Sequence, residues 1–256
     1  FLRERVWIVA CGIVIIALFL RLAYAESMDQ HPLFLVLVAE AGEYADMARG
    51  LGGGWVESPA PLYPHVLAAV GVDPSVVRVV QAMLGALSCA ILWLVGRAVW
   101  SPVPALAAGL AAAFYGPMIY FTGELLPVTW AVFFVLGSIL VLLRAESGEG
   151  PWLFFLGGLL LGLAVLCGSQ ALLLVPLVAL WIGWRRRNGL AVGLFAVGVG
   201  LAWLPLWGAW KLEVGDLAMV WQNLRLFWHG DEWITSVDPY WLRSESRLLG
   251  GLMWRW

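Results

Sequence analysis

Long apolar segments alternate with short polar ones along most of the chain. A helix needs about 20 apolar residues to cross a bilayer, and only a helix satisfies its own backbone hydrogen bonds in lipid. The apolar segments are residues 6–24, 75–99, 103–122, 124–145, 151–168, 169–184 and 189–210, and a further one opens at Leu248. The pattern therefore predicts an all-α, polytopic transmembrane protein with about seven spans plus the start of an eighth.

Polar positions are collected mainly in two segments, residues 25–74 and 211–247. Elsewhere the spans follow one another closely, and Gly123 and Gly168 mark two turns with almost no loop. Residues 1–256 are thus predicted to form a single transmembrane domain. Because the chain starts without Met and stops inside an apolar run, we expect it to be a fragment that lacks a C-terminal remainder.

Glycine recurs within two of the predicted spans, at Gly157-Gly158…Gly162 and at Gly193…Gly198…Gly200. Small residues let transmembrane helices approach closely. These glycine-rich stretches are therefore predicted to permit close helix packing.

Composition agrees with a membrane protein, since 62% of the residues are hydrophobic and 12% are charged. In a soluble domain about a quarter of all residues are charged. The net charge of -2 gives no indication of a nucleic-acid partner. Cys11, Cys89 and Cys167 each lie in an apolar run and are interpreted as packing residues.

The N-terminal segment has two interpretations. Arg3 and Arg5, an apolar stretch and Ala23-Tyr24-Ala25 are typical of a signal peptide with its cleavage site. Arg21 interrupts the approach to that site, which favours an uncleaved first span.

Charge predicts the orientation of the spans. One side carries seven Arg and three acidic residues, and the other carries fourteen acidic and seven basic residues. Because positive loops face the cytoplasm, the N-terminus is predicted to be cytoplasmic and both long polar segments to be external. Almost no ionisable residue falls in the middle of a span, which argues against a transporter.

The first outer segment contains a predicted amphipathic helix, Glu40–Leu51. Helical spacing places Glu40, Glu43, Tyr44, Met47 and Leu51 on one face. An interfacial helix lying on the membrane explains the same pattern. Ser58 to His65 follows, where three prolines predict an extended, stiff turn before a short apolar helix.

Several short motifs then occur in a recognisable order. They are Arg21-Leu-x-Tyr24, Glu40-Ala-x-x-Tyr44, Pro61-Leu-Tyr-Pro64, Arg78-x-x-Gln81, Tyr115-Gly-Pro-x-x-Tyr-Phe-x-Gly-Glu-Leu-Leu-Pro127 and Asn223-x-x-x-Phe-Trp-His-Gly-x-Glu232. In this order they resemble bacterial membrane glycosyltransferases of the GT-C superfamily similar to glycosyltransferase family 39, the protein mannosyltransferase and aminoarabinose transferase type.

The resemblance implies transfer of a sugar from a polyprenyl-phosphate carrier to an acceptor on the outer face of the bacterial cytoplasmic membrane. By position, Glu40 would be the general base toward the acceptor hydroxyl, and Glu124 matches a second acidic position. Residues expected to bind the substrate are Tyr44, Tyr63, Arg78, His229 and Glu232. The expected partners are the lipid-linked sugar, membrane lipid and, in some settings, other membrane subunits.

No cofactor is expected, with a divalent cation at His229-Gly-Asp231-Glu232 as the alternative. The sequence departs from the family pattern at two places. Relatives usually have Asp where this chain has Glu40, and many carry Arg-Pro-Asn where it has Gly168-Ser169-Gln170, so Arg78, Lys211 or Arg225 would have to hold the lipid phosphate. A non-catalytic GT-C-fold subunit, acting as scaffold in a larger membrane complex, is therefore the rival hypothesis.

Overall fold

The computed structural model describes residues 2–28, 40–51, 58, 60–186 and 189–204. In this part of the chain every regular element is a helix, as the apolar pattern predicts. Residues 1–211 belong to one compact unit, to which the description below is confined. The later polar segment, 211–247, and the apolar run from Leu248 lie outside the described residues.

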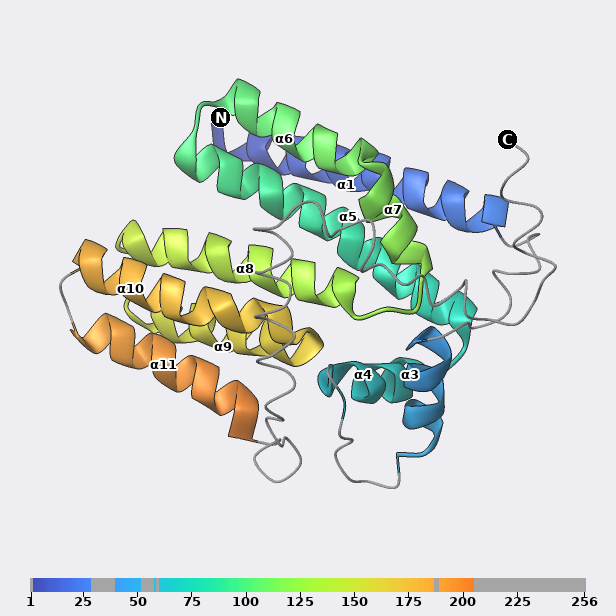
Figure 1. The fold of residues 1–256 in the computed structure, drawn as a ribbon. Coiled ribbons are helices and arrows are strands. Elements are labelled where there is room, and N and C mark those ends of the chain that lie inside the picture. Colours follow the sequence, from blue (N-terminus) through green and yellow to red (C-terminus); the bar gives the residue numbers. More distant parts are fainter. Residues whose placement is uncertain (1, 29–39, 52–57, 59, 187–188, 205–256) are drawn as a thin grey trace, which may run out of the picture. The chain divides into compact units, whose positions relative to one another are not determined.

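One group of helices is formed by α1 (Leu2–Met28), α5 (Pro74–Val99), α6 (Pro102–Phe114) and α7 (Gly116–Gly123), which lie side by side in Figure 1. Small side chains dominate the core between α1, α5 and α6. The start of α5 is capped by Asp73, whose carboxylate accepts a hydrogen bond from the amide of Ser75 at 2.9 Å. This bond holds the pKa of Asp73 below its usual value.

The sequence pattern predicts one helix for the third apolar segment. The structure has two helices there, bent by 47° relative to each other. The break falls at Tyr115, between α6 and α7. Pro117 explains the position, because proline has no amide hydrogen and its ring displaces the carbonyl of the preceding turn. The bend carries α7 toward the turn that contains Glu124.

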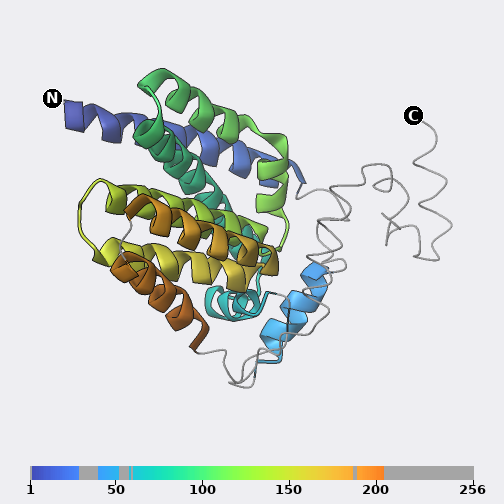
Figure 2. The ribbon, with the colours of Figure 1, turned by 60° about the vertical axis from the view of Figure 1, so that its left-hand side comes forward.

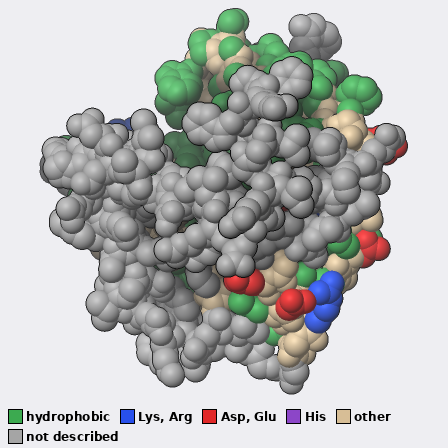
Figure 3. Space-filling view, turned by 45° about the vertical axis from the view of Figure 1, so that its right-hand side comes forward, with side chains coloured by type: hydrophobic (Ala, Val, Ile, Leu, Met, Phe, Trp, Pro, Cys, Tyr) green, Lys and Arg blue, Asp and Glu red, His purple; other side chains and the backbone are tan. Residues whose placement is uncertain are grey.

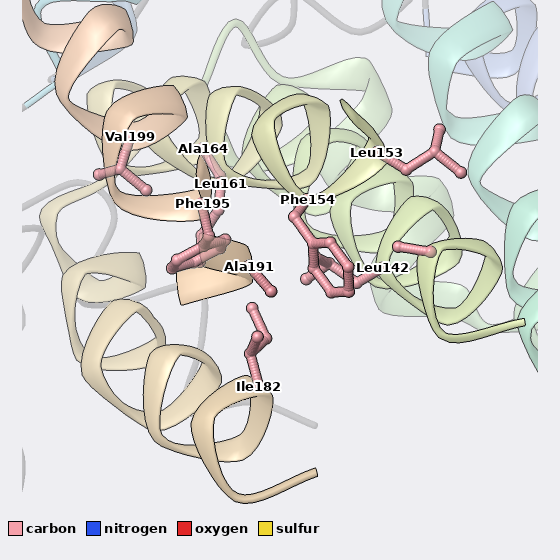
Figure 4. Close-up of a cluster of buried hydrophobic side chains, with 10 residues drawn as sticks. Leu142, Leu153, Phe154, Leu161, Ala164, Ile182, Ala191, Phe195 and Val199 are labelled. Atoms are coloured by element: carbon pink, nitrogen blue, oxygen red, sulfur yellow. The ribbon is translucent and has the colours of Figure 1, made fainter. Parts of the chain in front are cut away.

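A second group consists of α8 (Val128–Glu146), α9 (Trp152–Cys167), the 3-10 helix η1 (Ser169–Leu173), α10 (Leu174–Arg186) and α11 (Gly189–Trp203). Both ribbon views place α9 between α8 and α11, and it packs on both (Figures 1 and 2). Their shared core is apolar, with side chains such as Phe154, Ile182 and Phe195 gathered at its centre (Figure 4).

The α9–α11 contact depends on glycine, as predicted. A Cβ on Gly158 would overlap the carbonyl oxygen of Phe195, and one on Gly198 would overlap that of Phe155. The two backbones therefore touch. Gly193 and Gly200 have no such neighbour within 4 Å and take no part in the contact.

Three described helices, α1, α5 and α8, are long and apolar enough to cross a membrane. The bent pair α6–α7 makes a fourth if it counts as one span, and α9 and α11 are shorter apolar helices. The polytopic α-helical class is thus confirmed, and the count of seven spans stays a prediction.

Two short helices lie beside the N-terminal end of α5 (Figure 1): α3 (Glu40–Arg49) and α4 (Leu62–Val70). The predicted extended turn is shorter than expected, since α4 already begins at Leu62. Pro64 is tolerated there because the first turn of a helix has no use for its missing amide hydrogen.

Candidate functional site

Glu40 opens α3, and its side chain is exposed. Two acids in the first turn, Glu40 and Glu43, suit the positive end of the helix dipole. The buried face is formed instead by Ala41, Tyr44, Ala45 and Ala48. The predicted face, which joined the acids to Tyr44, is therefore wrong: Tyr44 points inward, and the two carboxylates lie on the exposed side.

Tyr44 packs edge-on against Tyr63 of α4, with ring centroids 5.2 Å apart. Burial raises the pKa of the Tyr44 hydroxyl, and the negative charge of Glu40 raises it further. The carboxylate of Glu40 is thus within electrostatic reach of Tyr44. Tyr63 is completely buried, and burial raises its pKa far above the ordinary value, so its hydroxyl stays protonated.

Gln81 of α5 continues this chain of contacts. The Tyr63 hydroxyl donates to Oε1 of Gln81 at 3.3 Å. On its other side, Nε2 of Gln81 donates to the carbonyl oxygens of Glu124, at 2.8 Å, and Leu126, at 3.4 Å. Gln81 has no exposed surface, and this amide therefore uses its donors and its acceptor inside the protein.

Arg78, one turn before Gln81, is 8% exposed. Its Nε donates to the carbonyl oxygen of Gly123 at 3.0 Å. Arg78 and Gln81 therefore hold three backbone carbonyls of the turn between α7 and α8. Arg78 was expected to bind substrate, and the structure places it behind this turn.

Glu124 lies in that turn and is half-buried. Its carboxylate interacts with the hydroxyls of Tyr120 on α7 and Tyr24 on α1. Two helices, α1 and α7, thus each place a tyrosine hydroxyl near this one acidic side chain. In Figure 3 a basic and an acidic side chain lie next to each other at the lower right, and the largest hydrophobic area of that view lies at its top.

A cavity of about 270 Å³ opens next to the same turn, between α5, α7 and α8. Its wall is mostly apolar, with a few hydroxyls, and includes Gly85, Ser88, Met118, Phe121, Thr122 and Val132. Phe121 and Thr122 come directly before the Gly123–Glu124 pair. The cavity therefore offers apolar volume immediately beside the acidic turn.

Arg21 was not identified as a site residue from the sequence. It is 1% exposed on α1, where Nη1 donates to the carbonyl oxygen of Ala17 and Nη2 to the sulfur of Cys89. Its Nε has no hydrogen-bond partner. A lone arginine inside an apolar span was the signal that could have found it.

The predicted residues that the structure brings together are Tyr44, Tyr63, Arg78 and Glu124, with Glu40 one turn before Tyr44. His229 and Glu232 lie outside the described residues, as do Lys211, Arg225 and the alternative cation site at Asp231. Gly168 is extended, and Ser169 and Gln170 open η1. Among the described residues there is no group of three His, Cys, Asp or Glu side chains placed to hold a metal ion.

Comparison with protein families gives a match to the dolichyl-phosphate-mannose-protein mannosyltransferase family over residues 61–210. Comparisons with curated proteins and with solved structures give no match. The matched range is more than half of the chain and contains Tyr63, Arg78, Gln81 and Glu124. The chain therefore belongs to this family of GT-C-type membrane glycosyltransferases.

Proposed function

We propose that the chain transfers a sugar from a polyprenyl-phosphate carrier to a hydroxyl group of an acceptor, at the outer face of a bacterial cytoplasmic membrane. Glu40 is the general base. It takes the proton of the acceptor hydroxyl while that oxygen attacks C1 of the sugar. The bond between C1 and the phosphate oxygen breaks, and the polyprenyl phosphate leaves with the electron pair.

One observation carries this proposal. The helix that bears Glu40 and the turn that bears Glu124 are joined through the buried contacts of Tyr44, Tyr63 and Gln81. Two carboxylates on a shared buried support suit acid–base work on a polar substrate. Glu124 supports the reaction by accepting hydrogen bonds from sugar or acceptor hydroxyls, and Glu232 is proposed to assist from the later polar segment.

The apolar cavity beside Glu124 supports a lipid-borne donor. A carrier of this class has a charged phosphate joined to a long isoprenoid chain. The cavity of about 270 Å³ offers an apolar wall within two or three residues of the acidic turn. The sugar of the carrier is thus proposed to lie near Glu124, which accepts hydrogen bonds from its hydroxyls, with part of the isoprenoid chain between α5, α7 and α8.

Transfer is tested with the purified full chain in lipid vesicles, using radiolabelled polyprenyl-phosphate mannose and membrane extract as the source of acceptor. Glu40→Gln removes the base and is expected to lower the rate at least about 100-fold. Glu43→Gln is the matched control, since Glu43 is an exposed acid in the same helical turn. Its rate is expected to stay within about twofold of wild type.

Full activity of Glu40→Gln would sink the assignment of the base. The second candidate function is a non-catalytic scaffold subunit, which the uncharged Gly168-Ser169-Gln170 at the start of η1 favours. A folded wild-type protein that transfers no sugar from polyprenyl-phosphate donors would support the scaffold instead.

A further inference from the structure

The turn between α7 and α8 is held by side chains more than by its own backbone. Within the described turn, one backbone hydrogen bond joins two of its own residues, from the amide of Leu126 to the carbonyl of Glu124 at 2.8 Å, and the carbonyl of Pro127 accepts from Ala131 at the start of α8. The carbonyls of Gly123, Glu124 and Leu126 all accept hydrogen bonds from side chains of α5. The position of Glu124 therefore depends on α5.

We infer that Gln81 is a positioning residue for the acidic turn, and that it sets where the carboxylate of Glu124 stands relative to α3. This rests on the proposed function, since Glu124 is a supporting acid there. Tyr63 and Arg78 act with Gln81. Their burial suits this role better than direct contact with substrate.

The direction of each hydrogen bond follows from chemistry. Two carbonyl oxygens can only accept, so they fix the Nε2 side of Gln81 toward the turn. Its Oε1 then faces Tyr63, whose protonated hydroxyl donates. No other orientation of the amide satisfies these partners, and the amide is therefore locked in one orientation.

The same chain of contacts reaches α3. Tyr63 packs against Tyr44, and Tyr44 lies one turn after Glu40 on the same helix. The distance between the carboxylates of Glu40 and Glu124 therefore depends on how three buried side chains pack between them. An error of about 1 Å in the placement of a catalytic group can cost about 100-fold in rate.

Gln81→Leu tests this role, because leucine fills a similar volume and makes no hydrogen bond. Ser138→Ala is the matched control: Ser138 is also buried and donates to a backbone carbonyl, that of Gly157, within the other helix group. Gln81→Leu is expected to lower kcat by about 10- to 100-fold with KM for the donor within about threefold. Ser138→Ala is expected to leave both nearly unchanged.

A double-mutant cycle separates positioning from general damage. In the Glu124→Gln background, Gln81→Leu is expected to lower kcat by less than about threefold more, because the group it positions is already gone. If the fold-losses of kcat in the two single variants multiply in the double variant, the inference is overturned. An equal loss of kcat in Ser138→Ala would overturn it as well.

Hydrogen exchange tests the positioning role of Gln81 without any measurement of activity. Gln81→Leu is expected to speed exchange of the Leu126 amide at least about tenfold, while Ser138→Ala leaves it unchanged. Unchanged exchange in Gln81→Leu overturns the inference even if the enzyme is active. A wild-type protein that transfers no sugar contradicts the proposed function alone, and the exchange experiment then still decides the role of Gln81.

Discussion

Arg21 brings a positive charge into the interior of the helix group formed by α1, α5, α6 and α7. A buried charge is costly unless it is paired and fully hydrogen-bonded. Arg21 has a carbonyl and a thiol as partners, and its Nε has none. Gly85 makes room for it, since a Cβ there would stand 2.7 Å from that Nε.

Replacing Arg21 should accordingly not harm the fold. Arg21→Met keeps the apolar stem and removes the charge, and we expect it to stabilise the protein by about 1 kcal/mol or more. The midpoint of thermal unfolding in detergent would then rise by a few degrees, about 2–4 °C per kcal/mol. Arg144→Met, at an exposed position of α8, is the control and should change little. A clear fall for Arg21→Met would mean that the guanidinium stabilises the fold.

At the residue scale, the sequence predicted which motifs would meet and not what each side chain does. Tyr63, Arg78 and Glu124 were expected at one site, and they do lie together. Gln81 was not expected at the site, although its spacing from Arg78 places both on one helix face. Their hydrogen-bond partners are backbone carbonyls. Every residue has one, so the sequence does not indicate which carbonyl is bound.

Among the described helices, α9 and α11 make a close backbone contact at two glycines. Gly158 faces the backbone carbonyl of Phe195, and Gly198 faces that of Phe155, in a reciprocal arrangement. Such contacts replace the hydrophobic driving force that is weak between helices in lipid. The contact therefore depends on the absence of two methyl groups.

Gly158→Ala and Gly198→Ala are each expected to destabilise the protein by about 1–3 kcal/mol, because the backbones must separate. Gly193→Ala and Gly200→Ala are the controls in α11, the helix of Gly198, since nothing lies within 4 Å of their added methyl groups. These controls should be neutral or slightly stabilising. Thermal unfolding midpoints of the four variants check the difference, and equal losses in all four would contradict the contact.

Periodicity and glycine content predicted the helices well and their irregularities poorly. Each of the seven predicted spans coincides with described helix for at least most of its length. The bend at Tyr115 was missed because a proline in an apolar run is compatible with a straight span and with a kink. The orientation of α3 was missed because alanine is weakly apolar, and the larger Met47 and the acids dominated the pattern.

For the molecule as a whole, the orientation predicted from charge can be tested by labelling. Cys11→Ala removes the one exposed cysteine of the described residues, and Cys89 and Cys167 are buried. In that background, Asp46→Cys on α3 should react with a membrane-impermeant maleimide in intact spheroplasts. Glu149→Cys, between α8 and α9, should react only after permeabilisation. The reverse result would invert the predicted topology.

The cavity between α5, α7 and α8 has a consequence for kinetics. Its walls belong to α5, α7 and α8, which alone or as part of the bent pair α6–α7 are apolar enough to cross a membrane, so we expect a lipid-borne donor to reach it from the membrane. Such a ligand searches for its site in two dimensions, and its relevant concentration is its mole fraction among the lipids. Adding inert lipid at constant total donor should therefore slow the protein, just as dilution with water slows a soluble enzyme.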